Sequence, residues 1–203
     1  MDISLSAARF APVSVPRAMA YAAERMRRRL AELPFLPTHA VIALFPGRVS
    51  IGPRGGDYSA NREVLRRDCG RLREEHPAYR FLESGNAYPL PAVQAARLAG
   101  LGVIGVNGLL HTPEYGSSVT IGAVLTDMPL SDGVPLEEED GYCPQCGECV
   151  RQCPTGALTY DGGTRTFERE KCLSHLRQKQ GASLERPGYY GCDICQNVCP
   201  MNS

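Results

Sequence analysis

Eight of the nine cysteines in this chain of 203 residues lie between positions 143 and 199, in two runs and one isolated position. The first run, from Cys143 to Cys153, reads C-x2-C-x2-C-x3-C-P, and the second, from Cys192 to Cys199, reads C-x2-C-x3-C-P. This is the ligand spacing of proteins with two 4Fe–4S clusters, in which the last cysteine of each run binds the other cluster. The segment has little apolar sequence of its own, so we expect its fold to depend on its clusters.

The exchange of the last cysteines predicts how the eight thiolates are shared between the clusters. One cluster combines the three-cysteine loop of the first run with the end of the second, and its ligands are Cys143, Cys146, Cys149 and Cys199. The other cluster takes the four that remain, Cys153, Cys172, Cys192 and Cys195. A long stretch separates Cys172 from Cys192, and we expect it to form a loop beside the second cluster.

Three other uses of cysteine fit this pattern less well. A disulfide framework is typical of secreted proteins, and the chain begins Met1-Asp2 rather than with a basic and then an apolar signal segment. Structural zinc sites use C-x2-C pairs but lack the third closely spaced cysteine and the paired C-P endings. Inert buried thiols do not repeat at fixed spacing, although Cys69, alone on its expected helix, is best interpreted as one.

The net charge is zero but is unevenly distributed along the chain. Residues 1–80 contain fourteen arginines against eight acidic residues, and the remainder is acidic. A basic surface suits phosphates, of tRNA or of a nucleotide-bearing cofactor. For Arg25, Arg27, Arg28 and Arg29, however, an ordinary solvated helix face is the favoured interpretation. No apolar run approaches the ~20 residues needed to span a membrane, and we expect a reducing, cytoplasmic setting.

Hydrophobic periodicity and turn residues predict a mixed α+β fold in two parts. An α/β front domain covers residues 1–130, and a double-cluster domain like that of bacterial ferredoxins covers residues 141–203. An acidic linker joins them. Within these parts we expect helices at 16–33, 61–75, 89–99 and 166–179, strands at 41–44, 103–112 and 119–126, and a hairpin at 157–167.

Residues 100–105 match the G-x-G-x-x-G pattern of dinucleotide-binding folds. In those folds the pattern follows a strand and opens a helix, with an acidic residue about 20 positions later. Here an expected helix precedes the pattern, β-rich sequence follows it, and position 120 is Thr120. We therefore expect these glycines to allow close backbone approach to a planar ligand rather than to bind a nicotinamide.

Several segments resemble the epoxyqueuosine reductases. They are residues 99–107 (Ala-Gly-Leu-Gly-Val-Ile-Gly-Val-Asn), 113–116 (Pro-Glu-Tyr-Gly), 121–127 (Ile-Gly-Ala-Val-Leu-Thr-Asp), 153–157 and 190–200 of the cysteine-rich part, and the pair at 57–58. The resemblance implies a cobalamin-reductase-like front domain, two 4Fe–4S clusters, a bound corrinoid, action on tRNA and distant kinship to reductive dehalogenases. The corrinoid contacts that it implies come from Gly102, Gly105, Asn107, Tyr115 and Gly116.

The chain departs from the family at its expected acid–base positions. The Asp that donates a proton in the family falls on Asn86, and an amide cannot deliver a proton as a carboxylic acid can. The carboxylate expected on the next helix is Ala92, the lysine expected near the glycines is Val106, and the expected histidine is Ser59. We therefore expect a short, divergent member with its scaffold and clusters kept and no catalytic residue assigned.

Two functions of different classes follow from these features. The first is a reductase in which the clusters receive electrons from a donor such as a ferredoxin or flavodoxin and pass them to a corrinoid. The second is a non-catalytic electron carrier or subunit without cobalamin, which the loss of the expected acid at Asn86 favours. A cavity beside residues 100–116 that is large enough for a corrin ring would favour the first.

Overall fold

The structure is a computed structural model that describes residues 3–47, 50–52, 55–136, 143–180 and 192–202. Its centre is a four-stranded antiparallel sheet with the order β1-β2-β8-β5. The strands are β1 (Arg9–Ser14), β2 (His39–Pro46), β5 (Phe81–Ser84) and β8 (Val119–Thr126). Together with the flanking helices this confirms the mixed α+β class.

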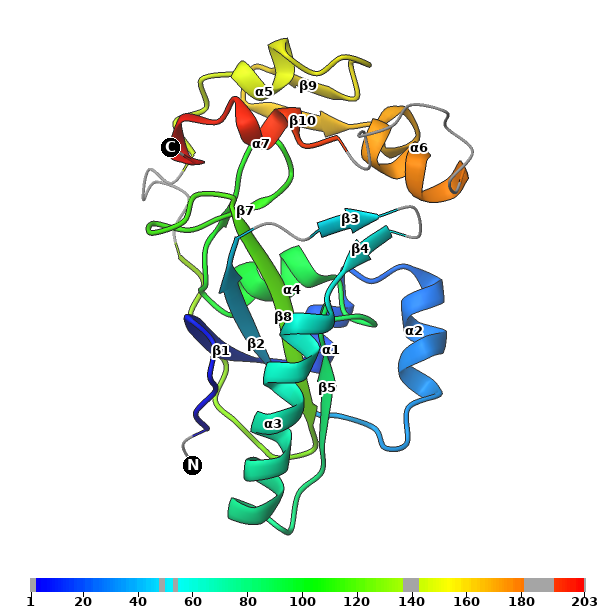
Figure 1. The fold of residues 1–203 in the computed structure, drawn as a ribbon, viewed down its shortest axis with the longest axis vertical. Helices are drawn as coiled ribbons and strands as arrows, with labels where there is room; N and C mark the ends of the chain where they lie inside the picture. Colours follow the sequence, from blue (N-terminus) through cyan, green and yellow to red (C-terminus); the bar gives the residue numbers. More distant parts are fainter. Residues whose placement is uncertain (1–2, 48–49, 53–54, 137–142, 181–191, 203) are drawn as a thin grey trace.

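The two faces of the sheet are covered by different helices, because successive residues of a strand point to opposite faces. In β2, Val41 and Ala43 pack with Leu65 and Leu72 of α3 (Ser59–Glu75). Ile42 and its even-numbered neighbours belong to a second core with α1 (Val15–Met19) and α4 (Ala92–Leu98). Figure 1 shows the sheet between these layers, which makes β2 and β8 the most buried strands.

The single helix expected at 16–33 is wrong, because the chain forms α1 and then α2 (Glu24–Ala31), separated by a turn. In the turn, the N–H of Tyr21 donates to the carbonyl of Ala18 and that of Ala22 to Met19. α1 buries Val15, Ala18 and Met19 against the sheet, whereas α2 has no buried residue. The alanine-rich sequence permits one helix, but packing α1 into the core overrides that propensity.

The other expected elements of residues 1–130 are largely confirmed. α3 and β8 lie where predicted, β2 is longer than predicted, and α4 is shorter. The strand expected at 103–112 is instead a small hairpin of β6 (Val103–Ile104) and β7 (Leu110–His111). Sequence reasoning missed β1 and β5 and the short β3 (Ser50–Gly52) and β4 (Gly55–Asp57), which pair with each other.

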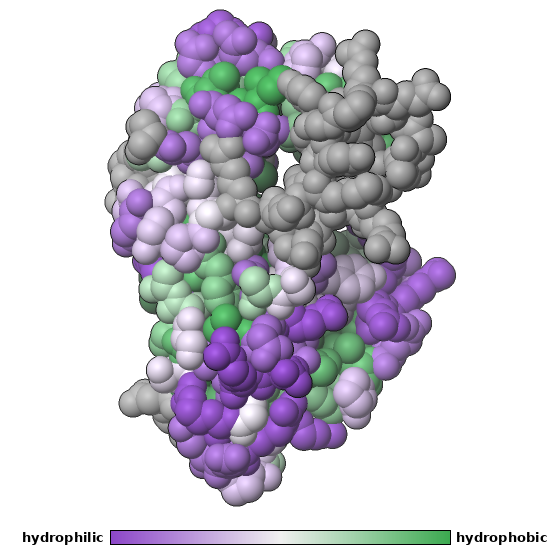
Figure 2. Space-filling model, in the orientation of Figure 1, coloured by the Kyte–Doolittle hydropathy of each residue, from purple (hydrophilic) through white to green (hydrophobic). Residues whose placement is uncertain are grey.

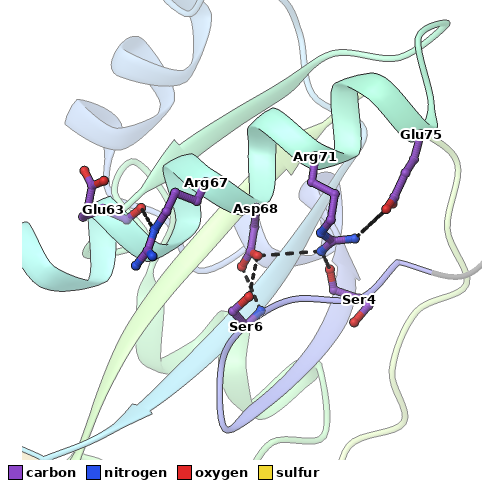
Figure 3. A network of polar contacts seen from close by, with 7 residues as sticks. All are labelled: Ser4, Ser6, Glu63, Arg67, Asp68, Arg71 and Glu75. Atoms are coloured by element: carbon purple, nitrogen blue, oxygen red, sulfur yellow. Dashed lines mark hydrogen bonds and ion pairs between the residues drawn. The ribbon is translucent and has the colours of Figure 1, made fainter.

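The N-terminal segment is held against α3 by a polar network (Figure 3). The carboxylate of Asp68 is almost fully buried and accepts hydrogen bonds from the backbone N–H of Ser6 at 2.8 Å and from its hydroxyl at 2.7 Å. Arg71 donates to the carbonyl of Ser4 and pairs with Glu75 at 3.0 Å. These contacts fix the start of the chain on the helix that carries one core.

Residues 143–180 and 192–202, called the tail from here on, lie at one end of the sheet (Figure 1). The tail contains short elements: α5 (Glu148–Arg151), β9 (Leu158–Asp161), β10 (Thr164–Phe167), η2 (Arg169–Lys171), α6 (Leu173–Gln180), α7 (Ile194–Asn197) and η4 (Pro200–Asn202). The hairpin expected at 157–167 is confirmed as β9–β10. The helix expected at 166–179 is wrong in its start, because Cys172 lies between η2 and α6.

The tail is attached to the rest of the chain by side-chain hydrogen bonds. Asn202 accepts from the backbone N–H of Ser117 at 2.6 Å and donates to the Ser117 hydroxyl at 2.9 Å. Gln196 of α7 donates to the Ser117 carbonyl at 2.7 Å. A side chain at Gly116 would be 2.1 Å from the Met201 carbonyl, so glycine is required for this contact. The acidic end of the expected linker, at 137–140, lies outside the described ranges, and so does the part of the expected loop at 181–191.

Candidate iron–sulfur centre and adjoining cavity

The four cysteines expected to share the first cluster lie around one small pocket. Its lining includes Cys143, Cys146, Cys149 and Cys199. Cys143 and Cys146 come from the loop leading into α5, and Cys149 lies in α5 itself. Cys199 comes from the turn between α7 and η4. Cys146 is exposed and the other three are half-buried.

The four cysteines expected to share the second cluster line a different and larger cavity of about 910 Å³. They are Cys153, Cys172, Cys192 and Cys195. Within the described residues, no three His, Cys, Asp or Glu side chains are grouped to hold a single metal ion. The thiols instead border hollows, as the ligands of a multi-iron cluster do, and the donor set fits two such clusters.

Burial and the neighbouring thiols oppose ionisation of one cysteine in each group. Burial raises the pKa of Cys149 to about 11, with further contributions from Cys143 and Cys146. Burial also raises the pKa of Cys195 to about 12, with Cys192 the next cause. Crowded thiols resist ionisation without metal, and binding of metal releases their protons.

Cys153 is the exception among these thiols. Burial alone pushes its pKa up, but the backbone N–H groups of Thr155, Leu158 and Ala157 lower it, and the net pKa lies below its ordinary value. The same N–H groups would stabilise a thiolate bound to iron, because hydrogen bonds to sulfur favour its charged form.

The large cavity is built by both parts of the chain. From residues 1–130 it is lined by Tyr58 before α3, Asn86 after β5, and the start of β8. Burial raises the pKa of the Tyr58 phenol above its ordinary value. The side-chain oxygen of Asn86 accepts from the backbone N–H of Tyr88 at 3.1 Å, so the amide is held at the cavity rim. Asn86, where the resemblance leads us to expect an acid, therefore faces the same cavity as the second cysteine group.

Of the five residues expected to contact a corrinoid, one lines the large cavity and four do not. Asn107 lines the cavity, together with residues 108–110. Gly102, Gly105, Gly116 and Tyr115 are not among the described residues that line it. Gly116 packs on the end of the tail, and a side chain at Gly102 or Gly105 would collide with His111 at 2.3 or 2.5 Å. Glycine is required at these positions because other segments of the chain itself, at His111 and Met201, pack closely against their backbone.

The remaining expected positions, together with His175 of α6, take ordinary structural roles or border the sites. Ala92 lines the large cavity and Val106 the small pocket. His175 also lines the cavity, and its Nδ1 accepts from Arg169 Nε at 3.2 Å. Cys69 is fully buried in the α3 core, and burial raises its pKa to about 12. The interpretation of Cys69 as a small core residue is confirmed.

The arginines of α2 and α3 are exposed except for the half-buried Arg71, and several of them are paired. Arg28 pairs with Glu24 and Arg29 with Glu32, over one helical turn in each case. Figure 2 shows hydrophilic side chains gathered over α2 and α3 on this face. Pairs of this kind on a solvated helix contribute little energy, in agreement with the interpretation as a solvated face.

Comparisons with known proteins place these observations in a family context. A model described as a 4Fe-4S double cluster binding domain matches residues 142–202. The epoxyqueuosine reductase of Lactococcus garvieae is 37% identical over 166 residues, which cover 77% of this chain and 45% of the relative. That of Bacillus subtilis is 31% identical over 188 residues, covering 80% of this chain and 46% of the relative.

The chain is epoxyqueuosine reductase-like. It spans about half the length of these curated relatives. Together with the double-cluster match, the similarity supports an iron–sulfur, oxidoreductase-type redox function.

Solved structures agree on the fold. The epoxyqueuosine reductase from Streptococcus thermophilus superimposes with a TM-score of 0.70 at 21% identity, over 97% of this chain and 62% of that one. A reductive dehalogenase whose structure suggested a B12-dependent mechanism has a TM-score of 0.66 at 20% identity, over 98% and 30%. At these identities the likeness establishes the fold alone. No helix in the described ranges is both long and apolar enough to cross a bilayer.

Proposed function

We propose that the chain is a cytoplasmic redox protein that passes electrons through two 4Fe–4S clusters to an acceptor held in the large cavity. The observation that carries the proposal is the shared wall of that cavity. Cys153, Cys172, Cys192 and Cys195 line it together with β8 and Asn86. An acceptor bound there would touch the second cluster's ligands on one side and the sheet-bearing part on the other.

The two cysteine sites differ in their exposure to solvent, and this difference suggests the direction in which electrons pass between the clusters. Cys146 of the first site is exposed to solvent, whereas the second site opens into the cavity. Electrons from a donor such as a ferredoxin or flavodoxin would enter at the first cluster and leave from the second. The assignment of the eight cysteines to two clusters is part of this proposal.

A corrinoid is the acceptor that the family resemblance favours, and the cavity accommodates a large ligand. Its volume of about 910 Å³ lies at the upper end of ligand pockets in proteins. When bound, a corrinoid would supply a cobalt centre for reductive chemistry. The chain would hold it from β8, from residues 107–110 and from the rim at Tyr58 and Asn86. Because a related epoxyqueuosine reductase has been solved with an epoxyqueuosine-modified tRNA stem loop, a modified tRNA is the substrate to test first.

A carrier without cobalamin is the second candidate, and the cavity lining favours it. The residue at the expected acid position is Asn86, and Asp193, in the tail, is the one carboxylate among the described lining residues. A carrier needs no proton donor. In this case the cavity would receive part of a partner protein or a small soluble acceptor.

The deciding experiment is the iron and cobalt content of protein purified without oxygen and incubated with cobalamin. About eight irons and one cobalt per chain would support the corrinoid protein, and about eight irons without cobalt would support the carrier. Fewer than eight irons would contradict the two-cluster proposal. Val119→Trp should fill the cavity and abolish cobalt binding while iron stays, and Val134→Trp, at a position 81% exposed, is the matched control.

Asn86→Asp tests whether the rest of a reductase pocket persists. The exposed rim position tolerates the change sterically, because Asp and Asn have nearly the same shape. If the corrinoid protein is correct, the variant should gain reduction of epoxyqueuosine in tRNA, and Asn86→Asp with Ala92→Asp should gain more. No gain in either variant, with cobalt bound, would mean that the substrate is different.

A further inference from the structure

A buried polar pair lies between the two cysteine sites. Asn107 is 7% exposed and lines both the small pocket of the first group and the large cavity of the second. His111 is 1% exposed and lines the small pocket. Asn107 lies in the loop of the β6–β7 hairpin, and His111 ends β7. Buried polar groups of this kind are retained at a cost, which makes their contacts informative.

The hydrogen bonds of Asn107 fix which way its amide points. Its Oδ1 accepts from the backbone N–H of Leu109 at 3.1 Å and lies 3.0 Å from Nε2 of His111. Because an amide oxygen can only accept, the proton of this contact lies on Nε2. Nδ2 then points the other way and donates to the carbonyl of Cys195 in a long hydrogen bond of 3.5 Å. One amide therefore joins a group at the first site to a ligand of the second.

The surroundings hold this arrangement in place. A side chain at Gly105 would lie 2.5 Å from the His111 imidazole, so only glycine leaves room for the ring. Arg165 of β10 donates to the Gly105 carbonyl at 2.9 Å and holds that backbone from the tail side. The glycine pattern that resembled a dinucleotide motif thus accommodates His111, and this role was not visible in the sequence.

We propose that Asn107 is a positioning residue that links the electrostatics of the two cluster sites, through His111 to the first and through Cys195 to the second. The inference rests on the proposed function for the presence of the clusters. Cluster potentials follow local charge and hydrogen bonding, and charges act strongly in a buried, low-dielectric region. A charge placed at Asn107 should therefore shift both potentials together.

Asn107→Asp in the complete, cluster-loaded chain tests the link, with redox titration followed by electron paramagnetic resonance at pH 8. The variant keeps the acceptor for Leu109 and His111 but replaces the donor to Cys195 with a negative charge. We expect iron content to stay at the wild-type level and both potentials to fall. The control is Gln94→Glu, the same amide-to-carboxylate change on α4 at a residue that lines neither pocket, which should shift both potentials less. A shift in only one cluster, or shifts no larger than the control's, would overturn the proposal.

If the Asn107→Asp variant does not take up its clusters, His111→Gln provides a second test of the link. The first cluster's potential should then move more than the second's, because His111 lines the first pocket. If neither potential moves, the link is refuted. Absence of clusters in the wild-type chain would refute the proposed function instead, so the two failures are distinguishable by iron content.

Discussion

The sheet-bearing part of the chain and the tail are stabilised in different ways. Residues 3–130 contain two apolar cores, one on each face of the sheet, with Ile42, Leu65 and Leu125 almost completely buried. Among the described residues of the tail, the buried apolar side chains are those of Ala157 and Leu158. A segment of this size cannot be ordered by so little burial. The contrast indicates that one part folds by burying apolar surface and the other by binding metal.

Removal of iron should have the largest effect, because it should unfold the tail and leave the sheet-bearing part folded. In protein stripped of clusters, we expect the amides of β9, β10 and α6 to exchange with solvent as in an unfolded chain, because the ligation energy is lost. The amides of β2 and β8 should remain protected. Hydrogen–deuterium exchange read by mass spectrometry measures both. Unchanged protection in the tail would mean that contacts such as Asn202 to Ser117 hold it without metal.

Substitution of a single cysteine should have the next largest effect, and it should change the iron content in the tail but not in the sheet-bearing part. Cys146→Ser should lower the iron content from about eight to about four per chain, because one cluster loses a ligand. Cys69→Ser removes a thiol from the core of the other part and should leave the iron content unchanged. Full iron in both variants would refute the ligand assignment.

The converse experiment substitutes a core residue of the sheet-bearing part and leaves the cysteines unchanged. Leu65 is fully buried between α3 and the sheet, and Leu65→Ala should lower the free energy of unfolding by about 2–5 kcal/mol. Denaturant unfolding followed by circular dichroism gives the value. Leu36→Ala, at a position 71% exposed, should stay within about 0.5 kcal/mol of wild type. Iron bound per folded chain should be the same in both.

A smaller effect is expected where the N-terminal segment meets α3. Asp68→Ala leaves the N–H and hydroxyl of Ser6 without their acceptor, which should cost about 1–3 kcal/mol of stability. The matched control is Glu75→Ala, which breaks only the half-exposed pair with Arg71 and should cost at most about 1 kcal/mol. Equal losses would show that burial of Asp68 does not matter.

The same division explains what the sequence could predict. Ligand spacing is local, so the cysteine groups that border the two hollows were named from the sequence alone. Strand β1 was missed because Pro12 argues against a strand, and proline is tolerated there because β1 is an edge strand of the sheet. The break between α1 and α2 depends on packing against the sheet, which a local pattern does not contain.

The site around Asn107 and His111 was beyond reach for a related reason. The glycines at 102 and 105 indicated close approach, but the partner lies across a hairpin whose strands are two residues long. Nothing in the local sequence shows that His111 is the group that needs the space. Local spacing therefore predicts ligands well, and contacts between distant segments determine how those ligands are tuned.

Cys69 gives the smallest effect and a test of the core by pH. Burial raises its pKa from 9.0 to about 12, so the folded state keeps a proton that the unfolded state loses above about pH 9. This contribution to stability is fully present below pH 9 and is lost as the pH rises toward 12. Between pH 9 and pH 10, wild-type protein should lose about 1 kcal/mol more than Cys69→Ala, measured by denaturant unfolding of both. The other eight cysteines are common to the two proteins and cancel, so parallel losses would mean that the α3 core admits water to this thiol.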